Sequence, residues 1–503
     1  MNWIDRAIGF VSPEWGARRV AWRNVLEERG MGYDAGNFDR LNANWRVLNE
    51  SAEYTDRNNR DTVRARARDL ERNSDMMNSV IGAFKRNVFG AGYTLQPKTE
   101  SEKINSELDA AWKKWCKKQN CDVTGTQSFN QIMRMCVERK KVDGGILIVK
   151  RYTNQGYLPF QLQTFEVDEL DDTCMKTKKN TNKLAGGIEY NEFNRPVGYW
   201  VKQYSIDGIE SQPKFIDAKD VIFYYTKKRP SQVREMSDMS PTMTRIRDAN
   251  EFMVAVSVKQ RIEACLSVFI KKSLPTTGLG RTGAGASGTQ QSYDGKTIAP
   301  GMIKELNAGD EIQTVNPSGQ STDAASYIKL QQRLVGAGQG ISYESTSRDM
   351  SQSNYSSARQ GIIEDDMTYQ EEIELLVEVM DEIYETFVIS CYLKGIISAK
   401  DFWENKEVFM NHQWVKAPKK WIDPYKEAMA NKIALNTGQK TYKQIAAEQG
   451  RDYKEQIDDM VEVLEYAKEK GIEMGGVIFG TDDDQSIYPP VNDDEGDGNK
   501  TKA

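Results

Sequence analysis

Apolar residues recur at spacings of mostly three and four between residues 61 and 87, and arginines occupy several of the positions between them. This is the period of an α-helix with one apolar face. The sequence therefore predicts a helix from about residue 61 that ends at the sequence VFGAG, residues 88–92. The same pattern predicts further helices at about 101–119, 128–142, 323–335, 355–393 and 424–470.

Short apolar runs separated by Gly, Pro, Asn and Asp predict strands rather than helices. The first follows Gly144 and Gly145, and the strands expected are 146–151, 160–165, 197–204 and 221–226, with two more short ones around 302–315. The expected helices cover more residues than these strands. The fold class expected is therefore α+β and predominantly helical.

The longest apolar helix of the first half is expected from Ser240 to about Lys272, because Ser240 suits a cap position and Pro241 the first helical position. At 1.5 Å per residue it would span roughly 45 to 50 Å. Residues 275–296, which are rich in Gly, Ser and Thr, predict a flexible loop after it. A helix of that length commonly crosses a whole layer of an assembly.

Composition adds limits to this picture. The 503 residues exceed what one core usually serves, and 39% are hydrophobic, so more than one lobe is expected. A formal net charge of −6 argues against a protein that coats phosphates with a basic surface. The six cysteines form no CxxC pair, and no apolar run of about 18 residues occurs, so a reducing compartment and no membrane span are expected.

The search for catalytic motifs is mostly negative. His412 is the only histidine, so neither a two-His metal site nor an HExxH motif can be formed, and it is expected to be structural. Residues 278–283 match GxGxxG without the flanking strand and helix, and Gly295-Lys296-Thr297 lacks the first glycine of a Walker A loop, since Gln290 stands there. No catalytic, cofactor-binding or metal-binding residue is expected.

Charged clusters have a simple and a functional interpretation. The paired acids, Asp171-Asp172 and Asp365-Asp366 among them, could hold Mg²⁺, but a solvated surface is favoured. The arginine-rich stretch 57–72 is interleaved with acids, so an exposed helix face is favoured over phosphate binding. A basic run in the strand-rich region is either a solvated loop or a docking site for a partner protein. Its members are Lys176, Lys178, Lys179 and Lys183.

Several segments, in order along the chain, resemble the lambda family of phage portal proteins. They are RARARDLERN followed by VFGAGYTLQP, GIEYNEFNRPVGYWV, DVIFYYTKKRPSQVRE, YESTSRDMSQSNYSSARQGIIED (343–365) and HQWVKAPKKWIDPYKEA. The third contains the Arg-Pro-x-Gln-x-Arg run that precedes the long helix. Two residues differ from those that we expect of the family: Phe223 stands in place of His, and Glu235 in place of Gly.

The resemblance implies a portal-type fold with a wing, a long stem helix, a β-rich clip and a helical crown. Applied to this sequence it gives seven regions: an N-terminal arm (1–56), the first part of the wing (57–165), a β-rich region containing the clip (166–238), the stem helix (239–273), a return through the wing with a Gly-rich loop and a channel loop (274–345), a C-terminal helical or crown region (346–480) and an acidic disordered tail (481–503).

The resemblance also implies a function. About twelve copies would form a ring at one capsid vertex, through which double-stranded DNA is packaged and ejected. Expected partners are the terminase large subunit, a head-tail connector or adaptor, and the major capsid and scaffold proteins, with assembly in the host bacterial cytoplasm and a final location in the virion. Residues proposed to contact DNA in the channel are Lys259, Lys271, Lys272 and Arg281.

Two alternatives remain open at this point. A head-tail adaptor or another virion structural protein would share many of these features, and ring geometry would distinguish it. A packaging ATPase or nuclease is disfavoured, because the chain has no complete Walker A loop and no histidine cluster.

Overall fold

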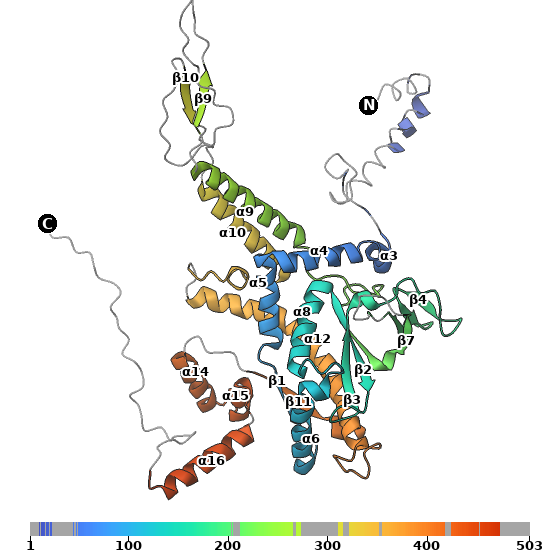
Figure 1. Ribbon diagram of the computed structural model, residues 1–503, viewed down its shortest axis with the longest axis vertical. Coiled ribbons are helices and arrows are strands. Elements are labelled where there is room, and N and C mark those ends of the chain that lie inside the picture. The colour runs from blue at the N-terminus through green and yellow to red at the C-terminus, as the bar shows by residue number, and fades with distance from the viewer. Residues whose placement is uncertain are drawn as a thin grey trace, which may run out of the picture.

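The computed structural model describes residues 50–202, 212–264, 268–272, 310–314, 321–351, 355–417, 424–451 and 453–472, together with Tyr204 and isolated positions between 10 and 49. Helices and antiparallel sheets are both present in these residues, and helices predominate. The expected α+β class is therefore confirmed. Figure 1 shows a body of helices packed on sheets and a helix pair, α9 and α10, that leads away from it.

The helix expected from residue 61 is divided into three parts. Ser74 ends the first and caps the second, with its hydroxyl 3.3 Å from the Met77 amide that donates to it. A serine side chain satisfies one of the amides that a helix start leaves unpaired. The parts are α4 (Arg60–Asn73), α5 (Asp75–Phe84) and the π-helical turn η2 (Lys85–Phe89).

The main core lies between three helices: α6 (Glu102–Trp115), α8 (Phe129–Asp143) and α12 (Tyr355–Leu393). Trp115 is fully buried, stacks on Phe160 with 5.3 Å between ring centroids, and donates to the Phe160 carbonyl over 2.8 Å. The bounds of α12 agree with the sequence prediction. Although the sequence analysis assigns α12 to a C-terminal region, it shares this core with helices of the first 165 residues.

The central strand β2 (Gly145–Tyr152) pairs antiparallel with β3 (Phe160–Phe165) and β8 (Val221–Tyr225). Alternate side chains of a strand point to opposite faces. Ile146 and Ile148 accordingly join the main core, whereas Leu147 and Val149 join a smaller second core. One strand thus serves two cores.

The second core is covered by a four-stranded sheet in the order β4-β5-β6-β7. We refer to residues 166–225, with this sheet, as the β lobe; Figure 1 shows it beside the helical body. Its strands are β4 (Lys183–Ala185), β5 (Ile188–Tyr190), β6 (Pro196–Val201) and β7 (Lys214–Asp217), and its 3-10 turns are η3 (Val167–Glu169) and η4 (Ala218–Asp220).

The long helix of the first half is shorter than the sequence predicts. Helix α9 spans Met243–Ala264, and Ser240 and Pro241 lie in the turn before it. The Ile246 amide donates to the Thr242 carbonyl, which fixes the helix start after residue 242. Residues Val268–Lys272 form strand β9, paired with β10 (Asp310–Thr314), because Val, Phe and Ile favour a strand.

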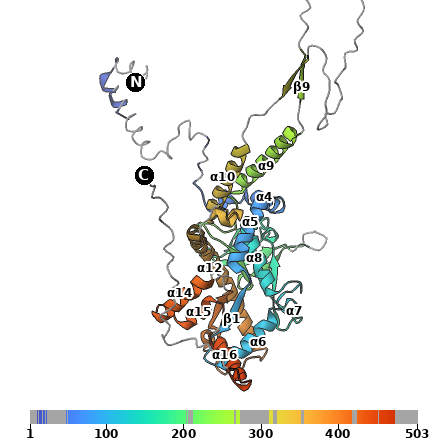
Figure 2. The same cartoon turned by 90° about the vertical axis from the view of Figure 1, so that its left-hand side faces the viewer.

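The returning helix α10 spans Ser321–Gln339 and runs beside α9, as both views of the fold show (Figures 1 and 2). Short helices and one strand pair complete the body. The strand β1 (Tyr93–Pro97) pairs antiparallel with β11 (His412–Lys416). The helices are α3 (Ala52–Asp56), α7 (Lys118–Cys121), α11 (Tyr343–Ser347) and α13 (Lys406–Met410).

The helical stretch expected over 424–470 consists of three helices rather than one. They are α14 (Pro424–Asn436), α15 (Tyr442–Glu448) and α16 (Tyr453–Glu469). Thr441 and Gln444 form a reciprocal capping box that begins α15. The acidic tail expected over 481–503 lies outside the described residues.

Candidate functional site

The α9–α10 pair is held together by an aromatic contact and leaves apolar residues exposed. The rings of Phe252 and Tyr327 lie 4.5 Å apart between the two helices. Val254 is 62% exposed, and other apolar side chains of the pair are exposed with it. Those are Met253, Val258, Leu330 and Leu334. Exposed apolar residues that lie together in this way are typical of a surface that contacts another protein.

The pair is fixed to the body at its base. The side-chain amide of Gln339 donates to the backbone carbonyl of Asp238 over 3.1 Å and to the Thr242 hydroxyl over 3.0 Å. A Cβ at Gly338 would lie 2.7 Å from the Thr242 methyl group, so this position requires glycine for close approach of the two segments. The direction of the pair is therefore set by the segment that precedes α9.

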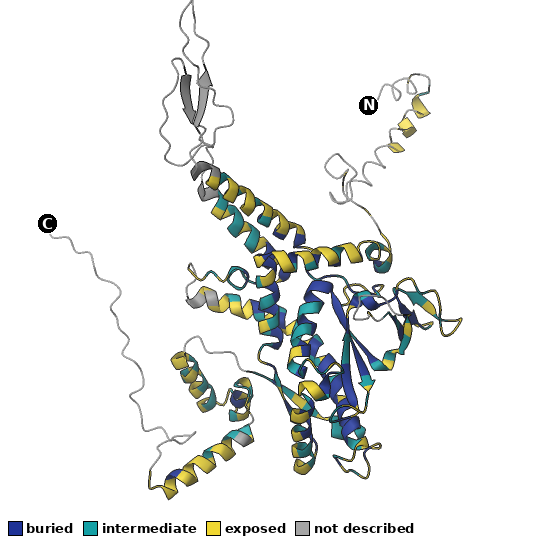
Figure 3. Ribbon diagram, viewed as in Figure 1, coloured by how far each residue is buried: buried dark blue, intermediate teal, exposed yellow. Residues whose placement is uncertain are grey.

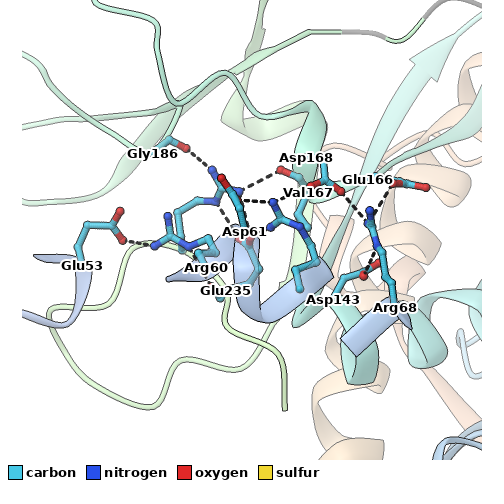
Figure 4. A network of polar contacts seen from close by, with 12 residues as sticks. Glu53, Arg60, Asp61, Arg68, Asp143, Glu166, Val167, Asp168, Gly186 and Glu235 are labelled. Atoms are coloured by element: carbon cyan, nitrogen blue, oxygen red, sulfur yellow. Dashed lines mark hydrogen bonds and ion pairs between the residues drawn. The ribbon is translucent and has the colours of Figure 1, made fainter. Parts of the chain in front are cut away.

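That segment, residues 229–239, contributes Arg234 and Glu235 to a network of arginines and carboxylates that we call the polar joint (Figure 4). Its other members are Arg60, Arg64, Arg68, Asp143, Glu166 and Asp168. Arg64 of α4 lies at its centre and is 5% exposed in its side chain. It contacts Glu235 over 3.1 Å and Asp168 over 2.6 Å. One side chain thus links α4, the segment before α9, and the β lobe.

Arg234 makes the second set of contacts in the polar joint. Its guanidinium donates to both carboxylate oxygens of Glu235, over 2.7 and 3.0 Å, and to the carbonyls of Gly186 and Val167 over 2.7 and 2.9 Å. Burial alone would lower the pKa of Arg234, but the charge and hydrogen bonds of Glu235 outweigh it and raise that pKa. The side chain is therefore a fixed cation that binds two carbonyls of the β lobe.

Arg68 extends the polar joint toward α8. It contacts Asp143 over 2.7 Å, Asp168 over 2.7 Å and Glu166 over 3.0 Å. Burial opposes its charge, yet the hydrogen bond and charge of Asp143 dominate and raise the pKa of Arg68. These contacts link α4 to α8 and to the β lobe.

A second charged cluster lies on the other side of the same segment. Asp238 contacts Lys140 over 3.2 Å and Lys228 over 3.0 Å, and Lys140 also contacts Glu372 of α12. Burial would raise the pKa of Asp238, but these lysines outweigh it and lower that pKa. Burial lowers the pKa of the neighbouring Lys141 to about 8. The segment leading into α9 is thus held by charges from both sides.

This arrangement can position elements, but it does not resemble a catalytic site. Each carboxylate of the polar joint is occupied by an arginine, which leaves no oxygen cluster for a metal. Within the described residues no group of three His, Cys, Asp or Glu side chains is arranged to hold a metal ion. Nor does any helix of the described chain combine the length and apolar character needed to cross a membrane.

A comparison with protein families identifies the family of the chain. The model of "Phage portal protein, lambda family" matches residues 38–372, which is more than half of the chain. The chain belongs to this family. Like other members it is a portal protein, a structural component of the virion.

Curated relatives agree along most of their length. The probable portal protein of Halomonas phage phiHAP-1 is 24% identical, covering 86% of this chain and 86% of that protein. The portal protein of Escherichia phage N15 is 21% identical over 86% of this chain and 89% of its own, and portal protein B of Escherichia phage lambda is 21% identical over 84% and 87%.

Solved structures from gene transfer agent particles are similar at a lower level. A chain of the virion of the native particle matches with a TM-score of 0.44 and 11% identity, covering 76% of this chain and 93% of that one. A chain of the neck of the native particle, computed with C12 symmetry, matches with a TM-score of 0.43, 10% identity, and the same coverage of both chains.

The structure places the four lysines expected to dock a partner in one part of the portal subunit. Lys176, Lys178 and Lys179 belong to the loop before β4, and Lys183 begins β4. The fully buried Glu189 accepts the backbone amides of Lys178 and Lys179, so a carboxylate organises the loop. Their docking role stays a prediction.

The residues expected to contact DNA are less closely grouped. Lys259 lies on α9 and is half-buried. Lys271 and Lys272 belong to strand β9, not to the helix on which the sequence analysis places them, because the helix ends earlier. Arg281 lies outside the described residues, as do the two glycine motifs. The DNA contacts stay a prediction.

Two simple interpretations of charged residues were wrong. Arg60 and Arg64 are buried in the polar joint, so α4 does not present all its arginines to solvent. Asp365 is also buried, and it accepts the Ser342 amide over 2.6 Å and the Ser342 hydroxyl over 2.8 Å at the start of α11. His412, in contrast, is packed 4.2 Å from the Tyr384 ring and contacts Asp381 over 2.9 Å, which fits a structural histidine.

The polar joint itself is the site that the sequence analysis missed. A signal was present: Arg60, Arg64 and Arg68 are spaced by four, which places them on one face of a helix. Glu235, noted only as a departure from the family pattern, is the buried carboxylate that contacts Arg64 and Arg234.

Proposed function

We propose that the portal ring stands at a single capsid vertex and that double-stranded DNA passes through its centre during packaging and ejection. The α9–α10 pair serves as the stem, which lines or surrounds the channel. The observation that carries the proposal is this pair, which leads away from the body with exposed apolar residues along it (Figures 1 and 3). Neighbouring stems in a closed ring would cover those residues.

The clip is then placed differently from the expectation. We expected it in the β-rich region 166–238, but that region is joined to the body by the polar joint and by the core beneath β2. The strands β9 and β10 instead follow α9 and precede α10. We therefore assign the clip to residues 265–320 and regard the β lobe as part of the wing.

Specific partners follow from the same proposal. The terminase large subunit and the head-tail connector or adaptor would bind the clip side at successive stages, and the major capsid and scaffold proteins would bind the wing. Lys176, Lys178, Lys179 and Lys183, at the edge of the β lobe, are candidate contacts for one of these proteins. Assembly would occur in the host bacterial cytoplasm, where the ring nucleates the procapsid.

The portal needs no catalytic step of its own in this scheme. An acidic net charge suits a channel, since each phosphate neutralised by Lys or Arg adds affinity that would hold a moving duplex. Lys259 on the stem, and Lys271, Lys272 and Arg281 beyond its end, would then supply a few DNA contacts at most.

Electron microscopy of the purified full chain, with the mass measured by light scattering, tests the proposal. Closed rings of about twelve subunits with a central opening wide enough for duplex DNA are expected. A compact dimer or tetramer without a channel at every protein concentration would contradict it and would favour a head-tail adaptor. Addition of scaffold protein is the control for a chain that stays monomeric alone.

A further inference from the structure

Two exposed arginines belong to neighbouring parts of the fold, the turn η2 that follows α5 and the end of α11. Arg86 belongs to the π-helical turn η2, and Arg348 ends α11; both are exposed. Neither forms an ion pair with an acid in the part of the chain that the structure describes. Burial lowers the pKa of Arg86, and the positive charge of Arg348 lowers it further, so the two guanidinium groups repel each other.

The two segments that carry these arginines are hydrogen-bonded to each other. Ser79, Gly82 and Arg86 lie on one face of α5 and η2, and the Ser79 hydroxyl donates to the Thr346 carbonyl of α11 over 2.6 Å. A Cβ at Gly82 would lie 2.8 Å from the Arg86 guanidinium, so glycine provides the space in which that side chain lies.

Arg348 is held in an unusual backbone conformation. Its φ of 59° lies in the left-handed region, which side chains other than Gly and Asn seldom adopt. A glycine would end α11 with less strain. Arginine is therefore an unusual residue at this position, and Met350, two residues further on, is 59% exposed.

The opposite charge is concentrated on the outer face of α12. Glu371, Glu374 and Glu378 are exposed at spacings of three and four, and no cation among the described residues pairs with them. Like charges at these spacings destabilise a helix. Ile363 and Met367 continue the same face and are 46% and 68% exposed. We call these five residues the acidic strip.

The arginine pair, Arg86 and Arg348, and the acidic strip lie on different sides of α12. The side of α12 that carries Asp365 and Tyr369 is buried toward α11 and α5, where Asp365 binds Ser342 and Tyr369 packs on Phe84. By the 3.6-residue period, the strip lies on the other side of α12. Figure 3 shows exposed residues along this half of the helix. One subunit therefore cannot neutralise its own two surfaces.

We propose that the arginine pair of one subunit contacts the acidic strip on α12 of the next subunit in the ring. The inference rests on the proposed ring, in which each subunit presents two different and complementary faces. Arginine matches carboxylates with paired hydrogen bonds. Met350 beside the arginines, and Ile363 and Met367 beside the glutamates, favour a protein neighbour over DNA phosphates, because apolar side chains gain from burial against protein.

Charge reversal tests the contact. In the full chain, Arg86→Glu with Arg348→Glu is expected to lower the fraction of subunits in rings at least about tenfold near the assembly midpoint. Glu371→Arg with Glu374→Arg is expected to do the same. The four substitutions together should restore rings, because attraction is restored with its direction reversed. The matched control is Arg66→Glu with Arg72→Glu, two exposed arginines of α4.

Each other outcome contradicts the contact. Normal rings from both reversed pairs would show that these residues do not meet across subunits. Loss of rings without recovery in the fourfold variant would show that each surface binds something else. Intact rings that retain less DNA after reversal of the arginines would assign the pair to DNA. Wild-type chain in the same experiment tests the ring itself, so failure of the proposed function is recognised separately.

Discussion

In the polar joint beneath α4, charged side chains are buried and paired, whereas along the α9–α10 pair apolar side chains are exposed. Arg64 and Glu235 are within 5% of complete burial, while Val254 is 62% exposed. Both arrangements are unusual for a single globular subunit. The charged side chains of the polar joint are paired within the subunit, whereas the apolar side chains on the outside of the α9–α10 pair are not covered by it.

The difference separates what one subunit completes from what the ring completes. The joint fixes the segment before α9, and Gln339 fixes the end of α10 against that segment. These contacts hold the α9–α10 pair in one direction on the body of the subunit. In the proposed ring, the exposed residues of this pair would then meet those of a neighbour without a search through many orientations.

Removal of Glu235 is expected to have the largest effect on the subunit. Glu235→Ala would leave Arg234 and Arg64 buried with a carboxylate missing, which costs about 3 to 5 kcal/mol in the free energy of unfolding. Urea denaturation followed by circular dichroism measures it. Glu404→Ala, at an exposed glutamate, should change that free energy by less than about 0.5 kcal/mol. Equal stability of the two variants would mean that the joint does not hold the subunit together.

Substitution of Lys141 is expected to have a smaller effect of opposite sign. Burial holds its pKa at about 8, below the ordinary value of 10.5. The unfolded chain therefore binds more protons between these values, and stability rises with pH across that window. Lys141→Met removes the charge and should stabilise the subunit by about 1 to 2 kcal/mol at pH 7.

The pH dependence distinguishes this cause from improved packing. The advantage of Lys141→Met over wild type should be full below pH 8 and should shrink as the pH rises toward 10.5. Denaturation at pH 7, 8, 9 and 10 measures it. An advantage that does not change over this range would contradict the assignment to the buried charge, and no advantage at pH 7 would show that Asp238 and Glu372 already compensate it.

Features that depend on local sequence could be predicted, whereas features that depend on contacts between distant segments could not. The spacing of apolar residues predicted α12 from Tyr355 to Leu393, because a long helical repeat is visible in the sequence itself. The extent of α9 was overestimated, since Val268–Lys272 continues an apolar run whose strand conformation depends on pairing with a segment 40 residues away. The polar joint was missed because arginine spacing shows a helix face but not what covers it.

The smallest expected effect on the subunit belongs to the α9–α10 pair. Val254→Ser with Val258→Ser should change the free energy of unfolding of the subunit by less than about 0.5 kcal/mol, because both side chains are largely exposed in it. The same variant should form fewer rings, since the stems would lose apolar area to bury. Light scattering over a dilution series measures the loss.

Phe193, which is 80% exposed on the turn between β5 and β6, provides the control. Phe193→Ser removes a larger apolar side chain from the β lobe and should leave ring formation unchanged. If both variants weaken rings equally, exposed apolar area anywhere promotes assembly, and the stem has no special part in it. If the stem variant instead lowers the stability of the subunit by more than about 1 kcal/mol, α9 and α10 are packed within one subunit more closely than their exposure indicates, and the contrast with the polar joint fails.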